Sequence, residues 1–245
     1  MSIGGMRFRH DGRTPGQMRP VNIQMDVQKW ATASLIWKQG DTHVLCSATV
    51  EDRVPPFLRG KGSGWVTAEY AMLPTATSER MQRESVKGKL GGRTYEIQRL
   101  IGRSLRGVVD TSTMGEKTVT VDCDVIQADG GTRCASITGG FIALSLALRK
   151  AGLERAVTSK IAAISVGIVE ATPLLDLEYT EDSSAEVDFN VVGTDAGTYV
   201  EVQGTAEGKP FDREGMDALL ALADNGLEQL FKIQDTVLVG ESAEQ

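Results

Sequence analysis

Histidine is nearly absent from this chain, and its scarcity removes most of the common catalytic schemes. The 245 residues include two histidines, His10 in a polar opening segment and His43 in a strand-like pattern. No GxSxG, HExxH or EF-hand spacing occurs either, which excludes the commonest hydrolase and calcium sites. The chemistry therefore has to come from carboxylates, arginines and backbone amides framed by glycine.

Cysteine and long apolar runs are also scarce. Cys46, Cys123 and Cys134 show no CxxC spacing, and each lies in or beside an apolar run, as is typical of buried thiols in a reducing compartment. We therefore do not expect zinc bound through cysteine. No segment approaches the roughly 18 apolar residues of a membrane span, and the N-terminus carries no hydrophobic leader. These absences predict a cytoplasmic protein without membrane association.

The net charge of −7 conceals two zones of opposite sign. Residues 80–106 hold eight basic and two acidic side chains, whereas residues 170–188 hold seven acidic side chains and no basic one. The first zone suits a polyanion and the second a divalent cation. Taken alone, each charge run is more typical of a solvated surface.

Strand patterns followed by helix patterns occur twice, which predicts an α+β fold built from two βα halves. The strands are expected at residues 21–28, 31–38, 42–50, 65–72, 118–127, 161–169, 173–177, 185–192 and 199–205, and the helices at 92–108, 135–150 and 212–232. We expect one domain over residues 1–245, with an N-terminal arm (about 1–20), a basic loop (about 75–92) and a C-terminal tail (about 236–245).

Two glycine pairs stand directly before helix patterns, and each is followed closely by an arginine. One is the stretch 129–133, DGGTR, and the other is 91–94, GGRT. Glycine lets the backbone come close to a ligand, and the free N–H groups of a helix start attract anions. Neither stretch fits the P-loop or dinucleotide-binding formulas, and a tight turn is the alternative at each. Together they indicate a phosphate site.

Asp182 and Asp188 are the candidate metal ligands of the acidic zone. Asp182 precedes a strand pattern and Asp188 falls on the polar face of that strand, so both could reach one magnesium ion. Such an ion would stabilise charge on a reacting phosphoryl group. Their spacing alone favours an acidic sheet rim instead.

Several ordered motifs, spread over nearly the whole chain, make a further comparison possible. They are RHDGR (9–13), RPV (19–21), GDT (40–42), GWVTAEY (64–70), KGKLGGRT (87–94), EIQRLI (96–101), DCDV (122–125), QADGGTR (127–133), DLEY (176–179) and QGTAEG (203–208). In these motifs the chain resembles the ribonuclease PH family.

The resemblance implies a phosphate-dependent 3′-to-5′ exoribonuclease, or tRNA nucleotidyltransferase, that trims the 3′ ends of tRNA precursors. Inorganic phosphate would be the co-substrate, nucleoside diphosphates the products, and extension from diphosphates the reverse reaction. It also implies Mg²⁺ or Mn²⁺ as cofactor, the ribosomal protein S5 domain 2-like fold, and a homo-hexameric ring of three dimers.

The resemblance also assigns roles to individual residues. The phosphate-binding set is Arg93, Gly131, Thr132 and Arg133. The metal-associated pair is Asp182 and Asp188, with Asp188 as candidate proton donor to the leaving 3′ oxygen; the catalytic set is this pair with Arg93 and Arg133. The RNA-binding set is Arg80, Arg83 and Arg99.

One position departs from the family pattern, and two other functions stay open. Thr75 follows Leu73-Pro74 where the family commonly has arginine, so we expect tRNA affinity to be weaker or differently placed. The main alternative is a non-catalytic RNA-binding ring subunit of an exosome-like assembly, in which the acidic and phosphate residues are lost; this chain has both sets. The second alternative is a metal-dependent nuclease that uses water.

Overall fold

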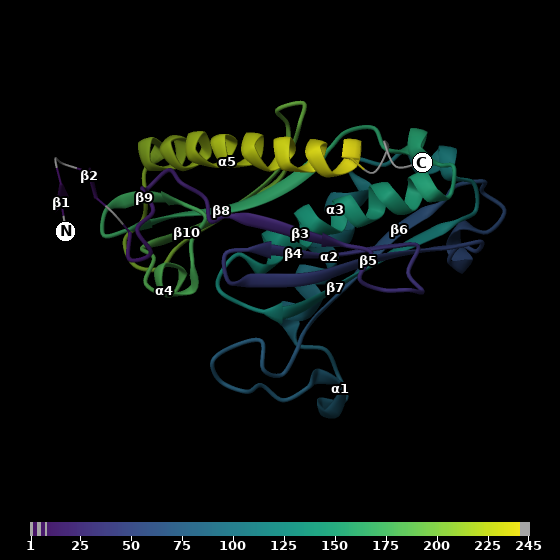
Figure 1. The fold of residues 1–245 in the computed structure, drawn as a ribbon, viewed down its shortest axis with the longest axis horizontal. Helices are drawn as coiled ribbons and strands as arrows, with labels where there is room; N and C mark the ends of the chain where they lie inside the picture. The colour runs from purple at the N-terminus through teal and green to yellow at the C-terminus, as the bar shows by residue number, and fades with distance from the viewer. Residues whose placement is uncertain (1, 4–5, 8, 241–245) are drawn as a thin grey trace.

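The chain folds into two β-sheets that share one long helix, α3 (Thr132–Lys150) (Figure 1). The computed structural model describes residues 2–3, 6–7 and 9–240. One main hydrophobic cluster runs through both halves, with Trp37, Phe141 and Phe189 among its largest fully buried side chains. The three cysteines are buried and free, as their apolar surroundings predicted.

The first sheet has five strands in the order β3-β4-β5-β7-β6. Its strands are β3 (Val21–Met25), β4 (Ala33–Gln39), β5 (Thr42–Glu51), β6 (Trp65–Met72) and β7 (Thr118–Gln127). The neighbours are antiparallel except for β6, which runs parallel to β7 at the edge. Helices α3 and α2 (Gly92–Arg106) pack against this sheet. Strand-like patterns predicted all five strands, with clear alternation of apolar and polar residues in β3 and β7, and β7 matches its prediction at both ends.

The second sheet has four strands in the order β11-β10-β8-β9. Its strands are β8 (Ile161–Val169), β9 (Thr172–Leu175), β10 (Val187–Thr194) and β11 (Tyr199–Ala206). Residues 161–167 of β8 are all buried, so side chains that point to either face of the strand are covered. Helix α5 approaches Ile164 at Gly226, and the Thr138 hydroxyl of α3 bonds to the Ala163 backbone. Burial on both faces explains why the sequence of β8 is mostly apolar.

The closing helix α5 (Arg213–Gly240) is longer than predicted (Figure 1). Its predicted end at residue 232 is wrong, because side chains beyond it still pack on the core. Gln234 is fully buried and donates to the carbonyls of Thr138 and Ile161, and Val237 lies against the main cluster. The described part of the predicted tail, residues 236–240, is therefore helical, and residues 241–245 lie outside the described chain.

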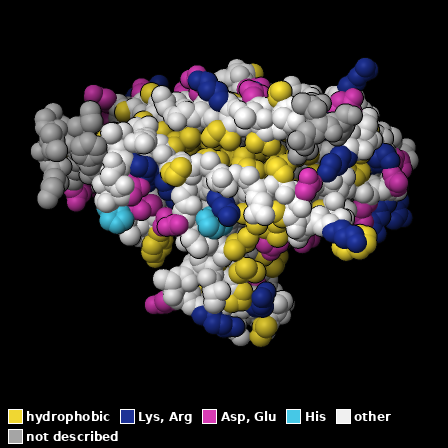
Figure 2. All heavy atoms as spheres, in the orientation of Figure 1, with side chains coloured by type: hydrophobic (Ala, Val, Ile, Leu, Met, Phe, Trp, Pro, Cys, Tyr) yellow, Lys and Arg dark blue, Asp and Glu magenta, His cyan; other side chains and the backbone are white. Residues whose placement is uncertain are grey.

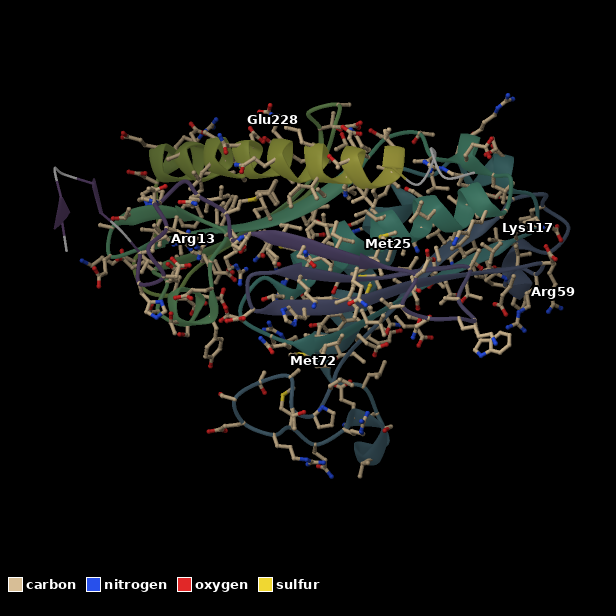
Figure 3. All side chains as sticks on the ribbon, in the orientation of Figure 1. Arg13, Met25, Arg59, Met72, Lys117 and Glu228 are labelled. Carbon is tan, nitrogen blue, oxygen red and sulfur yellow. The ribbon has the colours of Figure 1, made fainter. Side chains whose placement is uncertain are left out.

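Short helices were missed because their length gives no periodic signal. They are α1 (Glu84–Lys87), α4 (Tyr179–Asp182) and the 3₁₀ turns Pro56–Leu58, Thr111–Met114 and Glu154–Ala156. Helix α1 lies in the predicted basic loop, residues 75–92, which projects from the body of the molecule (Figure 1). Met72, the last residue of β6, marks the base of this projection (Figure 3).

The first twenty residues contain one short strand pair, β1 (Ser2–Ile3) with β2 (Met6–Arg7), and then no helix or strand among residues 9–20. Residues 1, 4, 5 and 8 of the predicted arm lie outside the described chain. The rest of the arm is held by buried arginines. Arg9 pairs with Glu181, and Arg13 donates to the Asp176 carbonyl at 2.9 Å, beside β9 and α4 (Figure 3).

Candidate active site

The loop between β7 and α3, residues 129–131, has the backbone that the glycine pair predicted. We call it the glycine loop. Gly130 and Gly131 have φ of +74° and +66°, in the left-handed region that favours glycine. A Cβ on Gly130 would also lie 2.5 Å from the Leu177 carbonyl oxygen, so the loop passes very close to the chain that leads into α4. Conformation and space therefore both require glycine at 130.

Helix α3 begins at Thr132, three residues earlier than predicted, so its first turn starts directly from the glycine loop. Gly131 is its N-cap, and no side chain caps the helix. The first-turn N–H groups of a helix have no partner inside it, and the helix dipole places partial positive charge there. This end of α3 therefore offers amide donors to an anion.

Arg93 and Arg133 come to this site from the first turns of two different helices, α2 and α3. The Arg133 side chain is mostly buried; its Nη1 donates to Gln203 Oε1 at 2.9 Å and lies 4.0 Å from Glu96. Arg93 is exposed. Burial raises the pKa of the Tyr70 hydroxyl, and the Thr132 hydroxyl, Arg93 and Arg133 oppose that shift, which places both guanidinium groups near one point.

Asp182 ends α4, and Asp188 lies on the adjacent strand β10. Burial raises the pKa of Asp182, and the negative charge of Asp188 raises it further, while Arg93 and Arg133 oppose the shift. Burial likewise raises the pKa of Asp188 against the effect of Arg133, of a hydrogen bond from Asn190 Nδ2 at 3.1 Å, and of Arg93. The structure thus brings together the four predicted catalytic residues, and each carboxylate is subject to the field of both arginines.

The donor set suits a hard divalent cation bound by few protein ligands. Two carboxylates that are partly buried and repel each other gain from a shared cation, and Mg²⁺ commonly keeps several waters beside one or two carboxylates. Over the described part of the chain, no group of three or more His, Cys, Asp or Glu side chains could hold a metal ion. Asp182 and Asp188 alone therefore fit magnesium better than zinc.

The predicted RNA-binding arginines lie on other surfaces. Arg80 and Arg83 are exposed on the projecting loop, where Figure 2 shows Lys and Arg side chains gathered. Arg99 is exposed on α2, in a shallow groove that Trp65 and Tyr95 also line. His10 is exposed and pairs with Glu178, and His43 is a half-buried residue of β5.

Sequence reasoning missed the residues that hold the glycine loop. Arg19 and Asp176 form a buried ion pair, with Arg19 Nη2 2.6 Å from Asp176 Oδ1. Thr42 and the Asp129 carboxylate also bond to the backbone around the loop. A partial signal was present, since Arg19 lies in the RPV motif and Thr42 follows the tight turn at Gly40-Asp41.

Comparison with protein families places the chain among known proteins. The model "3′ exoribonuclease family, domain 1" matches residues 17–154, and "3′ exoribonuclease family, domain 2" matches residues 160–226. The chain belongs to the 3′ exoribonuclease family. The two matches together cover every residue of the carboxylate and arginine cluster.

Individual members of the 3′ exoribonuclease family agree with this assignment. Ribonuclease PH of Syntrophomonas wolfei is 57% identical over 235 residues, which span 94% of this chain and 98% of that protein. The rice Rrp46 crystal structure has a TM-score of 0.77 at 19% identity, over 94% of this chain and 100% of that one. The structure of the Archaeoglobus fulgidus exosome with RNA bound to the active site has a TM-score of 0.75 at 22% sequence identity, over 92% of this chain and 92% of that one.

These matches confirm the resemblance to the ribonuclease PH family and the predicted ribosomal protein S5 domain 2-like fold. The division into a single domain stays a prediction. The two family models meet between residues 154 and 160, while the main hydrophobic cluster includes residues on both sides of that point. No helix in the described ranges is long and apolar enough to cross a membrane.

We predict that Gly130→Ala destabilises the protein more than Gly131→Ala. Both changes place a side chain at positive φ, which costs about 1–2 kcal/mol. Only at 130 would the new Cβ also meet a backbone oxygen at 2.5 Å; at 131 the nearest atom, Arg19 Nη2, is 3.4 Å away. Urea unfolding of the two variants checks the order, and equal losses would contradict the close approach.

We also predict opposite pH dependence for two aspartates. The pKa of Asp188 is raised on folding, so its charge destabilises the fold above that pKa. Asp188→Asn should therefore raise the melting temperature at pH 8, and the gain should vanish as the pH falls through the folded pKa.

Asp176→Asn is the matched variant of opposite sign. Burial opposes ionisation of Asp176, but the charge and hydrogen bonds of Arg19 hold its pKa below the ordinary value. Its stabilising effect is present above the unfolded pKa and is lost as the pH falls through the folded one. Breaking this buried pair should cost about 3–5 kcal/mol at pH 8. Melting temperatures measured from pH 8 to pH 3 check the pair. The same pH dependence in both variants would contradict the prediction that the two substitutions have opposite effects.

Proposed function

We propose that this chain is a phosphate-dependent 3′-to-5′ exoribonuclease that trims the 3′ ends of tRNA precursors and, in reverse, adds nucleotides from nucleoside diphosphates. The observation that carries the proposal is the meeting of Arg93, Arg133 and the uncapped start of α3 with the pair Asp182 and Asp188. Membership of the 3′ exoribonuclease family and the 57% identical ribonuclease PH support it.

Inorganic phosphate is proposed to bind at the N-terminus of α3, against Gly131, Thr132, Arg93 and Arg133. Its attack on the terminal phosphodiester brings two anions together, and two guanidinium groups offset that repulsion. Arginine suits this task because its planar group can donate two parallel hydrogen bonds to one phosphate. The bond from the attacked phosphorus to the preceding 3′ oxygen breaks, and a nucleoside diphosphate leaves.

The carboxylate pair is proposed to act on the leaving side of that bond. Asp182 and Asp188 would hold Mg²⁺ or Mn²⁺, which supplies charge neutralisation at the reacting phosphoryl group. The released 3′ oxygen needs a proton. Asp188 is the candidate donor, because its position matches the residue with that role in the family; burial raises its pKa in the metal-free protein, which is the direction that favours a bound proton.

The proposal extends to the residues that contact RNA and to the assembly of the protein. Arg80 and Arg83 on the projecting loop and Arg99 on α2 would contact RNA away from the reacting bond, and Thr75 leaves that loop with one arginine fewer than the family commonly has. We propose a homo-hexamer of three dimers in the cytoplasm, in keeping with the three free cysteines. The proposed hexamer would contain six projecting loops, and we propose that these loops bind the RNA.

The deciding assay uses a short 3′-tailed RNA with Mg²⁺, in the presence and absence of inorganic phosphate. We expect nucleoside diphosphates to be released only when phosphate is present. Nucleoside monophosphates would indicate a hydrolytic nuclease, and the absence of product would indicate a non-catalytic ring subunit.

Arg93→Ala and Arg133→Ala should each lower phosphorolysis by about a hundredfold or more, with little change in RNA binding, because each removes one charged donor to the attacking anion. Arg103→Ala is the control, since Arg103 lies on the same helix as Arg93 but pairs with Glu201 on β11. Wild-type phosphate dependence in either active-site variant would overturn the assignment.

RNA binding by the projecting loop is tested through salt. Arg80→Ala and Arg83→Ala should each reduce the slope of log K against log salt by about 0.7, the single-strand value for one phosphate contact. Arg213→Ala, an exposed arginine on α5, should leave the slope unchanged. Slopes equal to wild type in both loop variants would show that the loop does not contact RNA.

A further inference from the structure

The hydroxyl group of Thr42 makes two hydrogen bonds to the backbone of the glycine loop. Thr42, the first residue of β5, is buried, with 1% of its surface exposed. Its Oγ1 donates to the Gly130 carbonyl at 2.7 Å and accepts from the Asp129 N–H at 3.1 Å. One side chain therefore bonds to the peptide group that precedes Asp129 and to the peptide group that follows Gly130.

Arg19 reaches the same loop from the N-terminal arm and is also buried. Its Nε and Nη2 donate to Asp176 at 3.0 and 2.6 Å, and this double contact fixes the plane of the guanidinium. Nη1 then donates to the Asp129 carbonyl and lies 3.3 Å from the Thr42 hydroxyl. Nη1 also lies 3.6 Å from the Asp129 carboxylate, so Arg19 holds the loop through the Asp129 carbonyl and through an ion pair with the Asp129 side chain.

Asp129 connects the glycine loop to helix α4. Its Oδ1 accepts from the Tyr179 N–H at 3.2 Å, at the first residue of α4, and Asp182 is the last residue of that helix. The loop that starts α3 and the helix that carries Asp182 are thus bonded to each other, and Thr42 and Arg19 hold the junction.

We propose that Thr42 and Arg19 are positioning residues that set the affinity for inorganic phosphate; this rests on the proposed function. Two consecutive glycines have wide conformational freedom, because they have no side chain that would restrict φ and ψ. Amide donors serve an anion only when they point at it within about 2.7–3.1 Å. The bonds from Thr42 and Arg19 to the loop select the conformation in which the first N–H groups of α3 converge.

Thr42→Val tests the proposal, because valine keeps the shape and removes the hydroxyl. We expect the KM for inorganic phosphate to rise about tenfold, from the loss of two hydrogen bonds that fix the loop. The KM for RNA should stay at the wild-type value, and Thr42→Ser, which keeps the hydroxyl, should restore the phosphate KM. Calorimetric titration with inorganic phosphate should show the same loss without turnover.

Thr138→Val is the matched control. The Thr138 hydroxyl is equally buried, donates to the Ala163 carbonyl at 3.3 Å and accepts from the Ala163 N–H at 3.0 Å, but it joins α3 to β8 away from the loop. Thr138→Val removes the same bonds to one backbone carbonyl and one backbone N–H; Thr42→Val removes in addition the contact with Arg19 Nη1 at 3.3 Å, so it should lose at least as much stability as Thr138→Val. Its phosphate KM should not change.

Three outcomes would overturn the proposal: an unchanged phosphate KM in Thr42→Val, an equal rise in both KM values, or a similar rise in Thr138→Val. If Thr42→Val does not fold, Arg19→Lys carries the test, since lysine keeps the charge opposite Asp176 but cannot bond to Asp176 and the loop together. An unchanged phosphate KM in Arg19→Lys would then overturn it. Wild-type protein that needs no phosphate would refute the proposed function itself, a result distinct from all of these.

Discussion

A buried ion-pair cluster supports both the fold and the site. Arg9, Arg13 and Arg19 lie in a segment without helix or strand, and each reaches a carboxylate or a carbonyl of residues 175–181. Removing charges from water costs several kcal/mol per ion, so such pairs persist only when their geometry is good and their hydrogen bonds are made. Here those bonds replace the regular structure that the opening segment lacks. One of the three, Arg19, also donates to the Asp129 carbonyl, so this ion-pair cluster is connected directly to the glycine loop.

The site balances two opposing electrostatic demands. Burial raises the pKa of both carboxyl groups; Asp188 raises the pKa of Asp182 further and Glu207 that of Asp188, while Arg93 and Arg133 lower both. The two carboxylates are partly buried and repel each other, an unfavourable arrangement that a bound cation would offset. Such an arrangement is expected where binding rather than stability has been selected. Tyr70 is buried, and its hydroxyl lies 3.0 Å from the hydroxyl of Thr132, the first residue of α3.

Local pattern was enough to predict the strands and the three long helices, because alternation and helical periodicity report directly on which face is buried. Pattern failed where the cause is distant in the sequence. The four-residue helix α4 is too short for periodicity, and α5 continues past Lys232 because Gln234 bonds to strand and helix backbone far away. The glycine pairs and the acidic pair could be predicted from residue type and order. Arg19 and Asp176 each lie in a recognisable motif, but they are 157 positions apart, so no local pattern predicts that they form a pair.

The attachment of the arm to the second half bears on how the protein is made. Arg9 finds its carboxylate 172 positions later, at Glu181. A ribosome adds residues from the N-terminus, so the arm and the first sheet emerge while their ionic partners are still unsynthesised. Arg19 has no Asp176 to fix its plane during that time, and α4 with Asp182 does not yet exist. A nascent chain that stops before this point therefore has the two arginines of the site but not its carboxylates. The four residues of the candidate site can therefore come together only after Asp182 and Asp188 have been added to the chain.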